Sequence, residues 1–157
     1  MVTLRNATLA DSEGIWRVFT RAVRELARDA YTPEQIEAWA ALREPKDFAA
    51  VIGEREFQVA EDSGVIAGYG QLNVATAELE AVYVAPEYAG RGLGRQLMEL
   101  LEEKARAAGV KSLRLRASLN AVGFYEHLGW RIERREAHRL PSGVEFDVVH
   151  MTKALTL

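Results

Sequence analysis

The pattern of apolar and polar positions along the chain predicts four helices. In the first and third of them apolar residues recur every three or four positions, which is the spacing of one helix face. The second helix begins most clearly, since Thr32 can cap it, Pro33 suits its first position and Gln35 can complete a capping box. We expect that helix to end near Leu42, before Pro45. The predicted helices span residues 11–28, 32–42, 93–108 and 120–128.

Short apolar runs bounded by turn residues predict the strands of this chain. Turns at residues 61–64 and 141–143 join two pairs of strands into hairpins. The order is then one strand, two helices, three strands, a helix, a strand, a helix and two strands. Such a meander followed by a strand–helix–strand crossing predicts an α/β (α+β) fold, with a mixed sheet and helices on both faces. The predicted strands span residues 2–7, 57–60, 65–72, 78–84, 111–117, 130–137 and 144–151.

Composition changes this picture little but excludes several classes of function. A chain of 157 residues without repeats or long linkers predicts a single domain over residues 1–157. A net charge of −3 argues against a nucleic-acid-binding surface, because no excess of cations is available to neutralise phosphates. The absence of cysteine excludes disulfides and thiolate catalysis. We see no signal peptide and no apolar run long enough for a membrane helix, so we expect a cytoplasmic protein without membrane contacts.

The most informative segment runs from Val82 to Leu97 and reads VYVAPEYAGRGLGRQL. An apolar strand enters a glycine-rich turn, and the turn opens directly into a helix. The first N–H groups of a helix have no partner within it and lie at the positive end of its dipole, where they can bind a phosphate or pyrophosphate. Gly90, Gly92 and Gly94 remove the side chains that would keep a ligand from the main chain. We therefore expect a phosphorylated cofactor here.

Neither common nucleotide motif fits this turn. A P-loop needs Lys followed by Ser or Thr after its last glycine, whereas Arg95 and Gln96 follow Gly94. The dinucleotide fingerprint would need glycine at position 95 or 97, which hold Arg95 and Leu97.

At these residues the sequence resembles the GNAT superfamily of N-acetyltransferases. The diagnostic segments and the elements between them cover Leu79 to Trp130, about a third of the chain. Two positions depart from the family pattern: Ala89 stands where Arg or Gln is frequent, and Ser118 stands where Asn is frequent. The segments that carry the resemblance are Val84-Ala85-Pro86-Glu87-Tyr88, Gly90-Arg91-Gly92-Leu93-Gly94 and Ser118-Leu119-Asn120-Ala121-Val122-Gly123-Phe124-Tyr125-Glu126-His127-Leu128-Gly129-Trp130.

The resemblance implies a GNAT-like, mostly antiparallel sheet of about seven strands, acetyl-CoA as the cosubstrate and an amine as the acceptor. The acceptor is either a small molecule or a protein amino group. The strand before the glycine loop would pair with the pantetheine arm through main-chain atoms, and the loop would hold the pyrophosphate. The implied cofactor-binding residues are Val82, Val84, Gly90, Arg91, Gly92, Leu93, Gly94, Arg95, Gln96 and Asn120, with Ser118 as an alternative to Asn120.

Two catalytic residues are predicted. A protonated amine must lose a proton before it attacks a thioester, and a carboxylate beside the acceptor can take that proton. Regular alternation along residues 78–84 would put Glu80 on the same face as Val82 and Val84, so we favour Glu80 as the base and keep Glu78 as the alternative. Tyr125 occupies the position of the family's general acid. The three histidines lack metal-ligand spacing, so no metal is predicted.

Other features leave alternatives open. Aromatic residues of the first two helices, of the segment that connects them and of the strand at 78–84 are candidates to line the acceptor site, namely Trp16, Tyr31, Trp39 and Tyr83. Gly68 and Gly70, inside a predicted strand, favour close packing of a helix over approach of a ligand. A non-catalytic domain that binds or senses acyl-CoA, or a nucleotide-binding module, would retain the same loop. A homodimer is compatible with the sequence.

Overall fold

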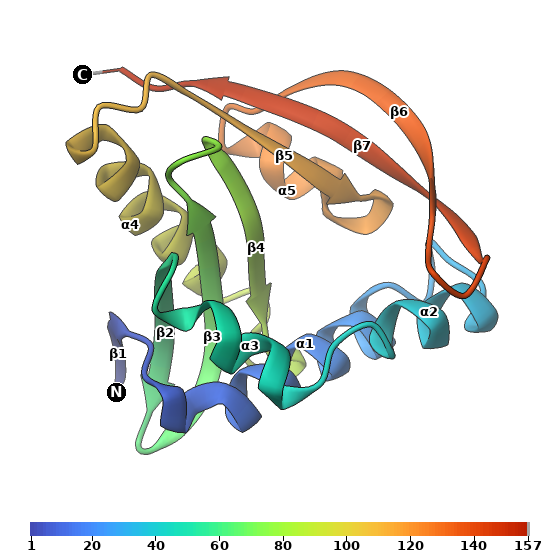
Figure 1. The fold of residues 1–157 in the computed structure, drawn as a ribbon, viewed down its shortest axis with the longest axis horizontal. Coiled ribbons are helices and arrows are strands. Elements are labelled where there is room, and N and C mark those ends of the chain that lie inside the picture. Colours follow the sequence, from blue (N-terminus) through green and yellow to red (C-terminus); the bar gives the residue numbers. More distant parts are fainter. Residues whose placement is uncertain (157) are drawn as a thin grey trace.

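The computed structural model describes residues 1–156 and contains one seven-stranded sheet in the order β1-β2-β3-β4-β5-β7-β6 (Figure 1). Every neighbouring pair is antiparallel except β4 and β5, which are parallel. The mixed, mostly antiparallel sheet predicted from the sequence is thus confirmed. The strands are β1 (Val2–Asn6), β2 (Glu56–Asp62), β3 (Val65–Asn73), β4 (Glu78–Val84), β5 (Ser112–Ser118), β6 (Arg131–Arg139) and β7 (Glu145–Ala154).

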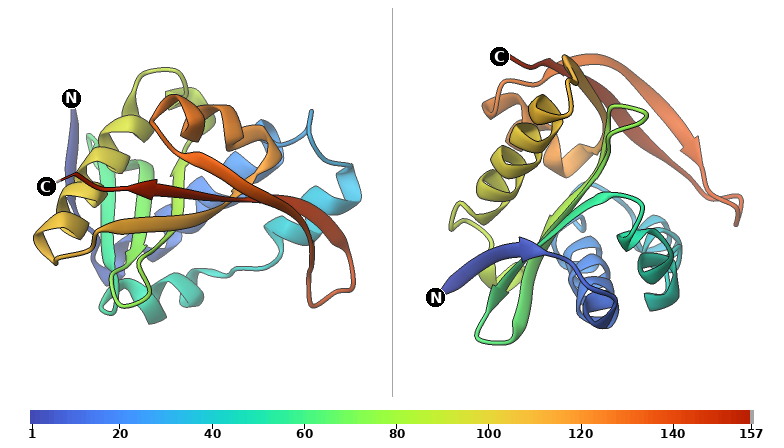
Figure 2. Two further views of the ribbon diagram at one scale, coloured as in Figure 1. Left: turned by 90° about the horizontal axis from the view of Figure 1, so that it is seen from above. Right: turned by 60° about the vertical axis from the view of Figure 1, so that its left-hand side comes forward.

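Helices cover both faces of this sheet, as predicted. Three helices pack on one face against Phe57, Val59 and Tyr69, whereas α4 packs on the opposite face (Figure 2). No helix among residues 1–156 is long and apolar enough to cross a membrane. The helices are α1 (Ser12–Leu26), α2 (Pro33–Ala40), α3 (Pro45–Ile52), α4 (Leu93–Ala107) and α5 (Val122–His127), with single 3₁₀ turns at Leu9–Asp11, Pro86–Tyr88 and Leu119–Ala121.

The hydrogen bonds at the start of α2 confirm the predicted capping box. The Thr32 hydroxyl accepts a hydrogen bond from the Gln35 N–H at 3.2 Å, and the Gln35 side chain accepts one from the Thr32 N–H at 2.9 Å. These reciprocal bonds satisfy two main-chain donors that a helix start leaves open. The same Gln35 side chain also donates to the Glu145 carbonyl at 3.0 Å, which ties α2 to the start of β7.

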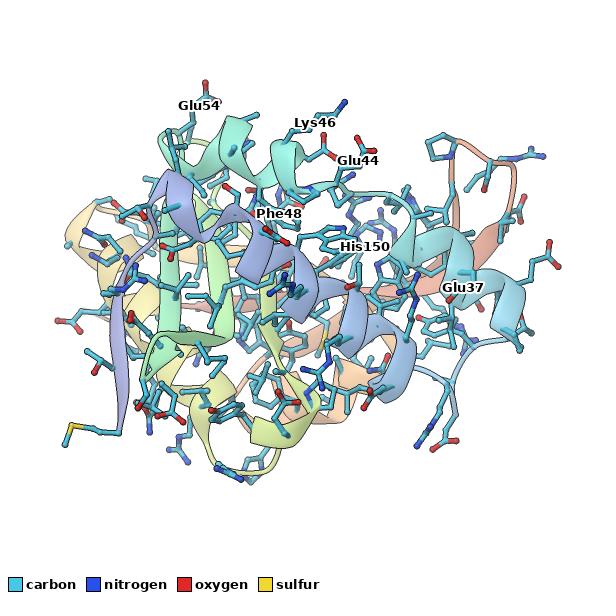
Figure 3. All side chains as sticks on the ribbon, turned by 90° about the horizontal axis from the view of Figure 1, so that it is seen from below. Glu37, Glu44, Lys46, Phe48, Glu54 and His150 are labelled. Atoms are coloured by element: carbon cyan, nitrogen blue, oxygen red, sulfur yellow. The ribbon has the colours of Figure 1, made fainter. Side chains whose placement is uncertain are left out.

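The predicted element order is wrong in one place, because helix α3 was not expected. Pro45 was interpreted as the residue that stops α2, but it is the first residue of α3. The Asp47 carboxylate accepts a hydrogen bond from the Glu44 N–H at 2.7 Å, the same arrangement that begins α2. Figure 3 shows Glu44, Lys46 and Glu54 projecting outward along this helix, while Phe48 points inward.

The glycines in β3 accept a helix, as predicted. A Cβ atom on Gly68 would lie 3.3 Å from the Leu97 side chain, and one on Gly70 would lie 2.6 Å from the Leu101 side chain. Both leucines belong to α4 and are fully buried. The absence of side chains at these two positions therefore lets α4 approach the sheet closely.

The predicted orientation of Glu80 is wrong, because β4 contains a bulge. Ala81 pairs with Gln71 and Leu79 pairs with Leu72, so Glu80 is an extra residue on its strand. Leu79 and Val82 both pack on the α4 side, in the cluster that contains Leu101. Glu80 instead hydrogen-bonds Gln71. Regular alternation would have required the carboxylate to face α4, and the bulge turns it to the other face.

A buried carboxylate connects α4 to the far part of the sheet. Glu102 is only 4% exposed, and its carboxylate lies 3.0 Å from the Lys153 ammonium on β7 and 3.5 Å from the Arg106 guanidinium. Lys153 also donates to the Leu128 carbonyl at 2.7 Å, just after α5. One ammonium group thus joins α4, α5 and β7.

Replacing Lys153 with methionine should lower the free energy of unfolding by about 3 kcal/mol, because the buried Glu102 carboxylate then loses the nearer of its two cations and keeps only Arg106. Urea titration followed by circular dichroism measures the change. The matched control is Lys46→Met, which breaks the exposed pair with Glu44 and should cost less than about 1 kcal/mol. Equal losses in the two variants would contradict the structural role of Lys153.

Candidate active site

The site is created where β4 and β5 separate. Glu78 and Arg114 form the only register pair between the two strands, and the Arg114 N–H donates to the Ala77 carbonyl at 3.1 Å. Beyond that point the strands diverge (Figure 1). Glu80 illustrates the result, since the residue as a whole is exposed although its side chain is only 23% exposed. Main-chain atoms of β4 are therefore open to a ligand.

A cavity of about 720 Å³ occupies this gap and continues to the glycine loop. Gly90 and Gly92 have φ angles of 78° and 79°, in the left-handed region that favours glycine. Gly92 is the N-cap of α4 and offers no side chain to its first turn. Within residues 1–156, the N–H groups of Leu93, Gly94 and Arg95 donate to no protein group. The helix thus presents unpaired donors at the cavity.

Most of the residues predicted to bind a cofactor line this cavity. The exceptions are Arg91, whose guanidinium lies 5.2 Å from the centre of the Tyr88 ring, and Gln96, whose N–H bonds to the Gly92 carbonyl. Ser118 and Asn120 both reach the cavity, so the choice between them stays open. The predicted residues that line it are Val82, Val84, Gly90, Gly92, Leu93, Gly94, Arg95, Asn120, Tyr125 and Glu80.

Tyr125 is buried at the wall of this cavity, on helix α5. Its ring packs edge-on against Phe124 and Trp130, with centroids 5.2 and 6.0 Å away. No group among residues 1–156 hydrogen-bonds its hydroxyl. Desolvation raises the pKa of Tyr125 well above its usual value, so the phenol keeps its proton throughout the physiological range. A protonated hydroxyl without a partner is able to donate to a ligand.

The two carboxylate oxygens of Glu80 differ in their hydrogen bonding. Both of its hydrogen bonds end on Oε1, from the Arg55 Nε at 2.7 Å and from the Gln71 Nε2 at 2.9 Å. No contact of this kind reaches Oε2 within residues 1–156. Arg55 therefore fixes the position of the carboxylate while the second oxygen stays available.

A second, smaller cavity of about 270 Å³ lies on the face of the sheet that Glu80 approaches. Glu80, Tyr83 and Trp39 line both cavities, so the two spaces meet at β4. Glu78, the alternative base, lines the second cavity but not the first. The second cavity is thus placed beside the carboxylate, on the far side of the strand from the glycine loop.

Of the four aromatic residues expected near an acceptor, Trp39 and Tyr83 line the cavities, whereas Trp16 and Tyr31 hold the surrounding structure. The Trp16 Nε1 donates to the Arg43 carbonyl at 2.9 Å. The Tyr31 hydroxyl donates to the Asp147 carbonyl at 2.7 Å and accepts from the Leu119 N–H at 2.8 Å. Tyr31 therefore ties the segment after α1 to β7 and to the turn that precedes α5.

Sequence reasoning missed several residues that line the larger cavity. Three residues of α1 and its C-cap residue contribute an apolar wall, and Phe124 faces Gly94 at the entrance to α4. His127 is exposed and lines the cavity as well. The apolar stripe of α1 was visible in the sequence, but which partner it faces depends on the fold. The α1 residues are Ala22, Val23 and Leu26, and the C-cap residue is Ala27.

Acidic and histidine side chains form no metal-binding group within residues 1–156. The larger cavity brings together main-chain donors, the Tyr125 phenol and the Glu80 carboxylate that Arg55 holds.

The fold and the loop define a class of protein. The family profile of the acetyltransferase (GNAT) domain matches residues 27–155, and the chain belongs to this family. The N-terminal strand and the whole of α1 precede the matched region, yet they complete the sheet and the wall of the cavity.

Individual relatives agree with this assignment. The chain is 25% identical over 135 residues to the uncharacterized N-acetyltransferase YafP of Escherichia coli (strain K12), covering 86% of this chain and 85% of that protein. The crystal structure of the GCN5-related N-acetyltransferase from Rhodopseudomonas palustris matches with a TM-score of 0.91 and 31% identity, over 98% of this chain and 95% of that one. The PaiA N-acetyltransferase from Thermoplasma acidophilum, solved in complex with coenzyme A, matches with a TM-score of 0.81 and 21% identity. The match covers 98% of this chain and 99% of that one.

Proposed function

We propose that this protein is an N-acetyltransferase that transfers an acetyl group from acetyl-CoA to an amine. One observation carries the proposal: unpaired N–H donors at the start of α4 open onto a cavity that continues between β4 and β5 to Tyr125. A diphosphate fits the donors, and an extended arm fits the open main chain of β4. Coenzyme A complexes of structural relatives support the choice of ligand.

In this proposal, main-chain atoms make most of the contacts that bind the cofactor. Residues 92–95 hold the pyrophosphate through N–H groups, which explains why Ala89 can replace Arg or Gln at the start of the loop. Arg95 adds positive charge at the cavity, although Glu99 holds its guanidinium at 2.8 Å. Val82 and Val84 pair with the pantetheine arm through their main chain.

The transfer itself would need two proton movements. Glu80 accepts a proton from the ammonium of the acceptor through its free Oε2, and the resulting amine attacks the thioester carbonyl. The nitrogen of the tetrahedral intermediate then releases its second proton to solvent, the intermediate collapses, the C–S bond breaks and the thiolate leaves. Tyr125, protonated because it is desolvated, donates a proton or a hydrogen bond to that sulfur.

Replacing Tyr125 with phenylalanine should lower kcat about 10²-fold, because the departing sulfur loses its donor. The ring keeps its packing against Phe124 and Trp130, so acetyl-CoA binding measured by calorimetry should stay unchanged. The assay follows free thiol release from acetyl-CoA with a panel of amines. Full kcat in the variant would contradict the role of Tyr125, and no amine-dependent release by the wild type would leave a non-catalytic acyl-CoA-binding domain.

Replacing Glu80 with glutamine should lower kcat/KM about 10²-fold at pH 7, because the amine then lacks its base. The loss should shrink as the pH approaches the ordinary amine pKa of ~10, since free amine becomes abundant without help. The pH profile of thiol release measures both effects. Glu78→Gln is the matched control on the same strand; if that variant shows the loss and Glu80→Gln does not, Glu78 is the base.

Replacing Gly94 with alanine should weaken coenzyme A binding about tenfold, equivalent to ~1.4 kcal/mol. The new Cβ would stand 3.2 Å from the Phe124 ring and 3.6 Å from the Val84 side chain, inside the cavity. Calorimetry measures the affinity. Gly53→Ala is the control, because a Cβ there meets nothing within 4 Å and lies outside the cavity. Equal affinities for the two variants would place the cofactor elsewhere.

A further inference from the structure

The second cavity has an apolar floor and a charged rim. Its floor consists of the buried side chains of Phe48, Tyr69 and Phe146. Two carboxylates, Glu78 and Glu80, stand on the side of β4. Two guanidinium groups, Arg43 and Arg116, stand on the rim. A ligand in this space would meet charges of both signs above an apolar surface.

Arg43 is held in position but has no anionic partner. Its main chain is fixed by the hydrogen bond from the Trp16 Nε1 to its carbonyl. Its guanidinium donates only to the neighbouring Leu42 carbonyl, at 3.2 Å, and no carboxylate within residues 1–156 lies within 4 Å of it. The loop between α2 and α3 therefore presents an uncompensated positive charge at the cavity.

Arg116 also lacks an anionic partner among the described residues. It lies on β5 at the junction of the two cavities, and within the described part of the chain it forms neither an ion pair nor a side-chain hydrogen bond. Many other arginines of the chain do lie within 4 Å of a carboxylate. These are Arg5, Arg17, Arg21, Arg24, Arg55, Arg95, Arg106, Arg134 and Arg135. Arg43 and Arg116, two of the arginines without a carboxylate of residues 1–156 within 4 Å, thus line the same small cavity.

We infer that the acceptor is an amino acid with an apolar side chain, an inference that rests on the proposed acetyl transfer. Its ammonium would meet Glu80, its carboxylate would meet Arg43 and Arg116, and its side chain would lie on the aromatic floor. Guanidinium groups suit a carboxylate because their N–H donors match its two oxygens. A simple amine would satisfy the carboxylates of the cavity and leave both guanidinium groups without an anion.

The test compares each of phenylalanine, leucine and methionine with its own amide, which keeps the amine and lacks the carboxylate. In the wild type, kcat/KM should favour the acid at least ~10-fold, and in Arg43→Met and Arg116→Met this ratio should fall toward one. The acetyl-CoA KM of Arg43→Met should not change, because Arg43 lies outside the larger cavity. Arg114→Met and Lys46→Met are the controls, because neither Arg114 nor Lys46 lines the second cavity. Arg114 lies two residues before Arg116 on the same strand, β5.

Binding is measured separately from catalysis. Trp39 lines the cavity, so quenching of tryptophan fluorescence by N-acetyl-phenylalanine, which has a carboxylate and no reactive amine, reports occupancy without turnover. Binding that Arg43→Met weakens supports the inference even if no amine is acetylated, and in that case only the transferase proposal fails. Acetylation of acids and amides with equal kcat/KM overturns the inference and leaves the transferase. Absence of both binding and acetylation overturns both.

Discussion

The separation of β4 from β5 after a single register pair is the constraint on which the rest of the structure depends. Inside a sheet, main-chain donors and acceptors are satisfied by the neighbouring strand, and each one left buried and unpaired costs about 1–3 kcal/mol. A strand that loses its neighbour therefore needs water or a ligand along that edge. Here the open edge of β4 runs directly into the glycine loop and the first turn of α4, so one continuous segment offers unpaired main chain over its whole length.

Such a gap persists only if the two walls are held in place, and side chains far apart in the sequence do this. At one side Tyr31 bonds both the Asp147 carbonyl and the Leu119 N–H, and Gln35 bonds the Glu145 carbonyl. At the other, the Glu102 carboxylate and the Lys153 ammonium join α4 to β7. These contacts couple the N-terminal helices to the C-terminal hairpin. Tyr31 thus has a positioning role for the turn that carries Asn120 and leads to Tyr125.

Much of the fold could be predicted from the sequence, because most helices and strands are marked by residues within or next to them. Thr32, Pro33 and Gln35 begin α2 as expected, and Gly68 and Gly70 accept α4 as expected. Helix α3 was missed although Glu44, Pro45 and Asp47 repeat the same starting pattern, because Pro45 was interpreted as a stop. The glycine loop could be predicted as a ligand site because the strand, the glycines and the helix start follow one another in the sequence. The second cavity was not, since Arg43, Arg116 and Phe146 meet only through the fold.

The bulge at Glu80 shows why the remaining error matters physically. With regular alternation, the Glu80 carboxylate would project toward α4, among Leu72, Met98 and Leu101, which are all fully buried. An unpaired carboxylate in that core would be severely destabilising. The extra residue leaves Leu79 and Val82 on the apolar side and turns Glu80 toward Arg55 and Gln71. The same irregularity that protects the core lets one strand present main chain to the larger cavity and a carboxylate to the smaller one, so the two cavities meet at β4.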